Sequence, residues 1–185
     1  VSRSAGNISH SATAGSTLPP PSSPRHEAPR GVDRADLAEV IARHDAGLDE
    51  HRPDAVAKRH DRGKRTAREN VADLVDPESF VEYGPTVIAA QRRRRDVDEL
   101  ITKTPGDGLV GGVGSVNGEL FADTDVATKA VIMSYDYTVL AGTQGYRNHH
   151  KKDRLIEVAR QLEAPVVFFT EGGGGRPGDP DAPGV

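Results

Sequence analysis

The chain has 185 residues, a length that suits one domain. Its formal net charge is −4 and aromatic residues make up 4%, so neither a positive field nor stacking rings predict nucleic-acid binding. There is no cysteine, which excludes disulfides, thiolate catalysis and Cys-ligated zinc. No apolar run has the length of a membrane span, and the first residues lack the apolar core of a signal peptide. We therefore expect a cytoplasmic protein.

The first 31 residues are rich in Ser, Pro, Gly and Ala and hold almost no large apolar side chains. Such a segment cannot bury enough surface to offset the entropy lost on ordering. We predict that residues 1–31 form a disordered tail, or a linker that follows another domain.

Helical signals dominate residues 32–76. Apolar residues recur at helical spacing after Asp33, at Leu37, Val40, Ile41 and Leu48. A second, basic helical region follows, in which Thr66 and Glu69 have the spacing of a capping box. An apolar stripe then runs through Val71, Leu74 and Val75. Pro77 ends this helix, because proline disfavours helical geometry in the residue before it.

Beyond residue 77 the apolar period changes to two. Residues 80–83 and 86–89 are predicted strands, whereas the polar stretch 91–104 is predicted to be a surface loop. It contains four consecutive arginines, for which a solvated loop is favoured over a phosphate contact. Asn117-Gly118, between residues 109–116 and 119–122, predicts a β-hairpin.

A strand, a helix and a second strand are predicted over residues 129–137, 149–162 and 165–170. The helix is expected to present one face formed by Lys152, Leu155, Ile156, Ala159 and Leu162. The last strand, Pro165 to Thr170, is predicted to be buried. Strand, helix and strand in this order predict a parallel crossover.

Four glycines, residues 172–175, come almost directly after the last predicted strand. Glycine lets a ligand approach closely and lets successive N–H groups aim at one point, which suits an anion or a developing oxyanion. For a glycine run alone, a flexible surface turn is an equal alternative. No Lys followed by Ser or Thr closes the run, so a Walker loop is disfavoured. The glycine spacing of residues 106–111 matches the dinucleotide-binding fingerprint. These residues precede a predicted hairpin and not a helix, so a dinucleotide-binding site is disfavoured.

The connection at residues 137–145 contains small residues and leads into the start of a helix. It could admit an anionic ligand, although an ordinary strand-to-helix connection is the alternative. The basic cluster at residues 149–152, His-His-Lys-Lys, could face a polyanion or be solvated. Neighbouring histidines point in different directions on a helix, so we predict no metal site.

Four blocks of residues occur in a fixed order: 62–69 with 74–82, 105–118, 135–143, and 171–176. They resemble the carboxyltransferase subunits of biotin-dependent acyl-CoA carboxylases over about residues 55–180. Residues 142–151 and 172–179 resemble most the carboxyltransferase of large single-chain bacterial acyl-CoA carboxylases.

The resemblance implies an α/β, crotonase-like fold, a β-β-α superhelix. Residues 77–185 would be the first, incomplete part of the carboxyltransferase N-half, preceded by the helical segment 32–76. The implied activity moves a carboxyl group from carboxybiotin to the α-carbon of an acyl-CoA. A non-catalytic assembly module and a biotin-dependent decarboxylase subunit are the alternatives.

The resemblance also implies partners for this chain. Biotin would sit on a carrier domain and not on this chain. The other partners would be biotin carboxylase, the C-half of the carboxyltransferase and further copies of the chain. Because the sequence stops ten residues after the last glycine of the run, we expect no turnover from this chain alone.

The implied site is an oxyanion hole in the glycine loop. We expect the amides of Gly174 and Gly175 to donate to the oxyanion, and Gly173 to shape the turn. The residues expected on the CoA side are Gly142, Thr143, Lys151 and Arg176. The family's commoner pattern has Ala where Gly175 stands, and the Pro-Gly-Asp at residues 177–179 also departs from it, which leaves the register of the hole open. No Ser-His-Asp or Cys-His arrangement lies near the loop, in keeping with a family in which biotin itself takes the proton.

Overall fold

The computed structural model describes residues 34–123 and 127–182; the predicted disordered tail, residues 1–31, lies outside these ranges. The helical segment consists of α1 (Ala35–Asp45), the 3-10 turn η1 (Asp49–His51), α2 (Pro53–His60) and α3 (Ala67–Leu74). The capping box is confirmed: the Thr66 hydroxyl accepts from the Glu69 amide at 3.0 Å, and the Glu69 carboxylate accepts from the Thr66 amide at 2.7 Å. The apolar stripe of α1 is exposed, and Leu48 lies beyond the end of that helix.

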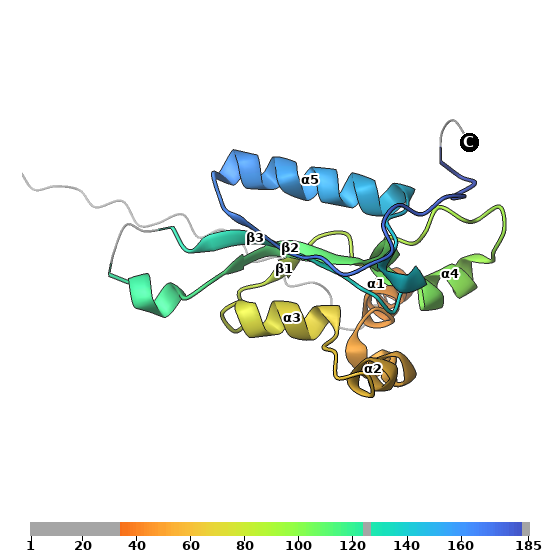
Figure 1. The fold of residues 1–185 in the computed structure, drawn as a ribbon, viewed down its shortest axis with the longest axis horizontal. Helices are drawn as coiled ribbons and strands as arrows, with labels where there is room; N and C mark the ends of the chain where they lie inside the picture. Colours follow the sequence, from red (N-terminus) through yellow and green to blue (C-terminus); the bar gives the residue numbers. More distant parts are fainter. Residues whose placement is uncertain (1–33, 124–126, 183–185) are drawn as a thin grey trace, which may run out of the picture. The chain divides into compact units, whose positions relative to one another are not determined.

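One four-stranded mixed sheet forms the centre of the fold (Figure 1). Its strands, in spatial order, are β1 (Val81–Glu82), β2 (Leu109–Ser115), β3 (Lys129–Tyr135) and β4 (Val166–Phe169). The β1–β2 and β2–β3 pairs are antiparallel, whereas β3 and β4 are parallel. The long helix α5 (Tyr146–Leu162) connects β3 to β4. The predicted parallel crossover is therefore confirmed, and β2, β3 and α5 follow each other in β-β-α order.

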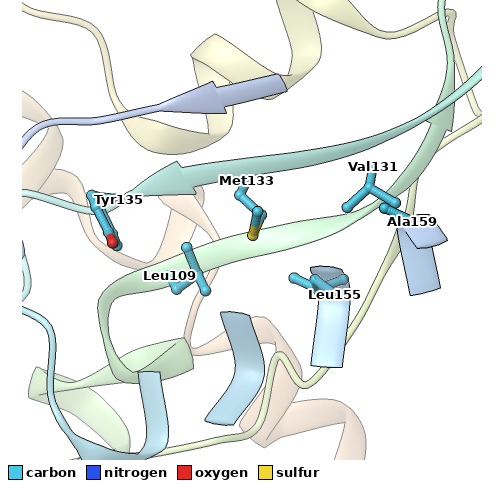
Figure 2. Close-up of a cluster of buried hydrophobic side chains, with 6 residues drawn as sticks. All are labelled: Leu109, Val131, Met133, Tyr135, Leu155 and Ala159. Atoms are coloured by element: carbon cyan, nitrogen blue, oxygen red, sulfur yellow. The ribbon is translucent and has the colours of Figure 1, made fainter. Parts of the chain in front are cut away.

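Helices cover both faces of the sheet, with α5 along one face and α3 along the other (Figure 1). Successive side chains of a strand point to opposite faces, so the core divides in two. On the α5 side, the strand residues Leu109, Val131, Met133 and Tyr135 pack against Leu155 and Ala159 of the helix (Figure 2). On the α3 side, the cluster consists of Ala67, Val71, Val110, Ala130 and Ile132.

The first strand and the turn of the predicted hairpin are confirmed, but the prediction of a second strand at residues 119–122 is wrong. Asn117 takes the left-handed conformation with φ of 56°, as Asn before Gly readily does. Residues 118–121 then form the 3-10 turn η3 (Gly118–Phe121) and not a strand. The Gly118 amide donates to a carboxylate oxygen of Asp76 at 2.8 Å. The antiparallel partner of β2 is β3, with Ser115 opposite Lys129.

Two further predictions before β2 are wrong. Residues 86–89 are not a strand: the Ala89 amide donates to the Thr104 hydroxyl at 3.1 Å, and Ile88 and Ala89 pack on Leu100. Leu100 belongs to α4 (Val97–Lys103), which lies inside the stretch predicted as a loop. Its Glu99 pairs with basic residues four positions away on either side, so charge spacing supports this helix where apolar periodicity does not.

The last helix and strand differ from prediction in what they bury. Helix α5 begins three residues earlier than expected and buries Asn148, Lys151, Leu155 and Ala159, whereas Ile156 and Leu162 are exposed. The predicted strand at 165–170 forms as β4, but at the edge of the sheet, so its side chains are half-buried to exposed and not buried.

Replacing Leu155 by Ala should lower the free energy of unfolding by about 2–5 kcal/mol, because its side chain is fully buried against the sheet. Ile156→Ala is the matched control: its side chain is 48% exposed, and the change should cost under about 1 kcal/mol. Urea unfolding monitored by circular dichroism measures both. Equal losses would show that α5 packs through a different face.

Candidate functional site

The glycine loop, residues 172–175, folds back on the connection between β3 and α5. The Gly173 amide donates to the Ala141 carbonyl at 3.1 Å. The Gln144 amide donates to the Gly174 carbonyl, and the Arg176 amide donates to the Gln144 carbonyl, both at 2.8 Å. The loop is therefore pinned to the connection by main-chain hydrogen bonds at both of its ends.

Two glycines make this close approach possible. A β-carbon on Gly142 would overlap the Glu171 carbonyl, and one on Gly172 would overlap the Gly142 carbonyl. Gly142 also has φ of +64°, which an L side chain rarely adopts. The two backbones meet here at a distance that only glycine permits.

The amides of Gly174 and Gly175 are free to bind an external acceptor. Both residues are exposed, and a β-carbon on either would meet nothing within 4 Å. Within residues 34–123 and 127–182, no acceptor lies in hydrogen-bonding position for either amide. The Gly173 amide, in contrast, is already bonded to Ala141. The loop thus leaves two successive N–H groups unbonded, in a segment that its neighbours hold in place.

Arg176, directly after the loop, is an internal cation. Its guanidinium pairs with Asp107 and, at 3.1 Å, with Asp179. All three side chains are at most 7% exposed. Asp107 lies in the turn η2 (Pro105–Gly108), where its own φ is +50°. This buried triad joins the end of the glycine loop to the turn that precedes β2.

The two carboxylates of the triad also occupy the start of α5. Asp179 accepts from the Tyr146 amide and Asp107 accepts from the Asn148 amide, each at 2.8 Å. A helix N-terminus favours negative charge, and the protein supplies it here from its own side chains. Gly145 completes the arrangement, because a β-carbon there would overlap the Arg176 guanidinium.

Lys151 is buried on the α5 side of the sheet and donates to the Leu109 carbonyl. Burial lowers the pKa of its ammonium from 10.5 to about 8, although Glu82 and Asp107 oppose the shift. Both Lys151 and Arg176, expected on the CoA side, therefore bond groups of the protein itself.

The other residues expected on the CoA side lie at the loop. Gly142 is buried beneath it, and the Thr143 hydroxyl donates to the Leu140 carbonyl at 2.7 Å. The basic cluster at residues 149–152 divides: His149 and His150 are exposed, and Lys152 donates to the Gln144 side-chain oxygen at 2.9 Å.

Two arginines of the helical segment reach the site and were not predicted. Arg59 on α2 donates to both carboxylate oxygens of Glu171, at 2.6 and 3.1 Å, and this bond lowers the pKa of the Glu171 carboxyl. Arg52 pairs with Asp136 at 2.7 Å and donates to the Thr138 hydroxyl at 2.6 Å. The acids follow β3 and β4 closely, but nothing local in the sequence indicates their partners about a hundred residues earlier.

The geometry defines a β-β-α domain in which a glycine loop with two unbonded amides is held against the strand-to-helix connection. The family model for the carboxyl transferase domain matches residues 58–179 of the chain. The chain therefore belongs to the carboxyl transferase domain family, and the resemblance seen in the sequence is confirmed.

Similar proteins agree with this assignment. A single-chain, multi-domain long-chain acyl-CoA carboxylase of known structure is 62% identical, with a TM-score of 0.75, over 82% of this chain and 15% of that one. The propionyl-CoA carboxylase beta chain of Saccharopolyspora erythraea is 31% identical over 140 residues, 76% of this chain and 23% of its own length. The methylmalonyl-CoA decarboxylase subunit alpha of Veillonella parvula is 33% identical over 140 residues, 76% of this chain and 25% of its own length.

These matches confirm the predicted crotonase-like fold of the carboxyltransferases. They also show that the chain spans about a quarter or less of the length of each of these relatives. Within the part of the chain that the structure describes, no helix combines the length and the apolar character needed to cross a membrane.

The buried ammonium of Lys151 predicts a pH dependence. Its pKa is about 8 when folded and 10.5 in the reference state, so between these values the unfolded chain binds more protons. Stability contributed by this residue therefore rises from about pH 8 to about pH 10, by at most about 3 kcal/mol. Urea unfolding across this window should show the wild type gaining stability relative to Lys151→Met. Lys152→Met, which removes a partly exposed neighbour, should leave the pH profile parallel to wild type.

Proposed function

We propose that this chain forms the acyl-CoA side of a biotin-dependent carboxyltransferase site, in which the amides of Gly174 and Gly175 hold the thioester oxygen. The observation that carries the proposal is that these two adjacent amides are exposed and unbonded within the described residues, while the loop around them is pinned at both ends.

The chemistry follows from where charge develops. Removing the α-proton of an acyl-CoA moves negative charge onto its thioester oxygen. Donors that are already in position stabilise that charge without reorganising, and removing one such donor costs about a hundred- to a thousandfold in rate. Carboxybiotin supplies the carboxyl group when its carrier is bound. The residues of this chain hold the oxygen and orient the α-carbon.

Glu171 lies next to the glycine loop and would oppose a developing anion if its charge were uncompensated. Arg59 bonds both of its oxygens, so the pair adds little net charge beside the proposed hole. Gly142 supports the loop from below and Thr143 adjoins it, which supports their place on the CoA side. Arg176 supports that side by bonding the carboxylates of Asp107 and Asp179, and Lys151 supports it by bonding the Leu109 carbonyl.

The names of the relatives suggest a substrate class and two possible reactions, carboxylation and decarboxylation. One is named for propionyl-CoA, and one for long-chain acyl-CoA; we propose an acyl-CoA substrate for this chain. We also propose, as partners, a biotin carrier, a biotin carboxylase, the second half of a carboxyltransferase and further copies of this chain. The decarboxylase relative supports a second candidate function, decarboxylation, because removing the carboxyl group creates the same enolate oxygen and needs the same two amides.

Amide NMR tests the proposed hole directly. Adding an acyl-CoA thioester should shift the Gly174 and Gly175 amide protons downfield, because each gains a hydrogen bond. The Gly173 amide is the internal control, since it already donates to Ala141 and should move least. Shifts at Gly173 with none at its two successors would refute the assignment.

The amide of Gly175 can also be removed chemically. We expect Gly175→Pro, which lacks the N–H group, to lower the rate of carboxyl transfer about a hundred- to a thousandfold. The assay uses a chimera in which residues 34–182 replace the equivalent part of the long-chain acyl-CoA carboxylase, which is 62% identical. Gly175→Ala keeps the amide and meets open space, so it should retain most activity. Comparable rates for the two variants would speak against an amide at this position.

A further inference from the structure

The acid that leads into the glycine loop is paired with a buried arginine of the helical segment. Glu171 directly precedes Gly172, and its side chain is 40% exposed. The Arg59 guanidinium donates to its two carboxylate oxygens at 3.1 and 2.6 Å, from a side chain that is 7% exposed. A two-pronged arginine–carboxylate pair of this kind fixes both the position and the charge of the acid.

Arg59 is also held by groups other than this carboxylate. Its Nε and one of its Nη atoms donate to the Arg65 carbonyl at 3.0 and 2.8 Å. Its guanidinium lies 5.4 Å from the centre of the Tyr137 ring, within the range of a cation–π contact. The cation is therefore fixed by three partners, of which Glu171 is one.

Glu171 lies close enough to the two unbonded amides of the loop for its charge to act on them. Three peptide units separate Glu171 from Gly174, so their α-carbons are at most about 11 Å apart. Main-chain hydrogen bonds between Gly173, Gly174 and the preceding connection hold this short segment in place. At that range, charges near a protein surface are only partly screened. An uncompensated carboxylate would therefore oppose negative charge that arrives at the amides.

We propose that Arg59 is a positioning residue of the carboxyltransferase site, which acts by cancelling the charge of Glu171. The carboxylate ties the start of the loop to α2, and the arginine removes the electrostatic cost of placing an acid there. The neutral pair leaves the potential at the two unbonded amides favourable to an anionic oxygen. The inference rests on the proposed function, because it takes these amides to receive the thioester oxygen.

Other cations near the loop are less suited to this role. Arg176 is shared by the carboxylates of Asp107 and Asp179, so it has no positive charge to spare. Lys64, like Arg59, lowers the pKa of the Glu171 carboxyl through its charge. Lys64 is exposed, however, and within residues 34–123 and 127–182 it forms no hydrogen bond with that carboxylate.

Hydroxide-catalysed hydrogen exchange, followed by NMR on the full chain without substrate, measures the potential at the Gly174 and Gly175 amides. The exchange passes through a negatively charged amide, which a nearby negative charge disfavours and a positive one favours. At low ionic strength, we expect Arg59→Gln to slow exchange at both glycines about two- to tenfold, the range for a unit charge about 10 Å away. Glu171→Gln should speed exchange by a similar factor, because it leaves the arginine uncompensated. The double variant should exchange at the wild-type rate.

Recovery in the double variant separates charge from structure. If Arg59 only held the loop in place, its loss would loosen the loop with or without the acid. The Gly173 amide, which donates to Ala141, would then exchange faster in both variants. Lys64→Gln is the matched control: it removes the same charge from an exposed side chain that does not bond Glu171, and should have a clearly smaller effect. Arg59→Lys keeps the charge and should exchange close to the wild-type rate.

The assignment of Arg59 is overturned if the single and the double variant exchange equally slowly, or if the Lys64 variant has as large an effect. It is also overturned if Glu171→Gln does not speed exchange. That variant decides the matter even if Arg59→Gln fails to fold, because the acid is 40% exposed. Failure of an acyl-CoA to shift the Gly174 and Gly175 amide signals would instead remove the proposed function, and the exchange rates would stand apart from that result.

Discussion

The buried guanidinium of Arg176 is the constraint on which the candidate site depends. Taking a charge out of water costs several kcal/mol unless it is paired and hydrogen-bonded. Two of the three guanidinium nitrogens of Arg176 meet that condition, through the carboxylates of Asp107 and Asp179. These same carboxylates bond the first turn of α5. The glycine loop, the turn before β2 and the start of α5 are therefore held in one arrangement, and the loop's free amides take their position from it.

Much of the fold could be predicted because its signals are local. The capping box at Thr66 and Glu69 needs only residues three apart, and the crossover of β3, α5 and β4 follows from the order of the apolar segments. Local signals fail where a tertiary contact decides the outcome. The amide of Ala89 bonds a side chain fifteen residues away, so a strand-like stretch is not a strand. In α5 the buried face keeps Leu155 and Ala159 of the apolar pattern but includes the polar residues Asn148 and Lys151.

For the site, the sequence was enough to predict a loop with exposed amides, but it was not enough to predict which charged side chains pair with each other. A glycine run after a strand indicates exposed amides, and the structure places those of Gly174 and Gly175 in the open. Nothing in composition or spacing distinguishes a cation that binds a ligand from one that holds the backbone. In the structure Arg176 bonds the carboxylates of Asp107 and Asp179, and Lys151 bonds the Leu109 carbonyl. In the sequence, Lys58 and Arg62 cannot be told apart from the other basic residues of their helical region. Within the described residues, neither side chain forms an ion pair.

The position of β4 at the border of the sheet affects how the chain behaves in isolation. A border strand exposes one row of main-chain donors and acceptors, and an apolar one is a template for pairing with another chain. At the other border, β1 has only two residues, too few to recruit a neighbour. In β4, Val166 is 44% exposed and the three residues after it are partly so. The main-chain edge of β4 is thus the side of the sheet to which a further strand can add.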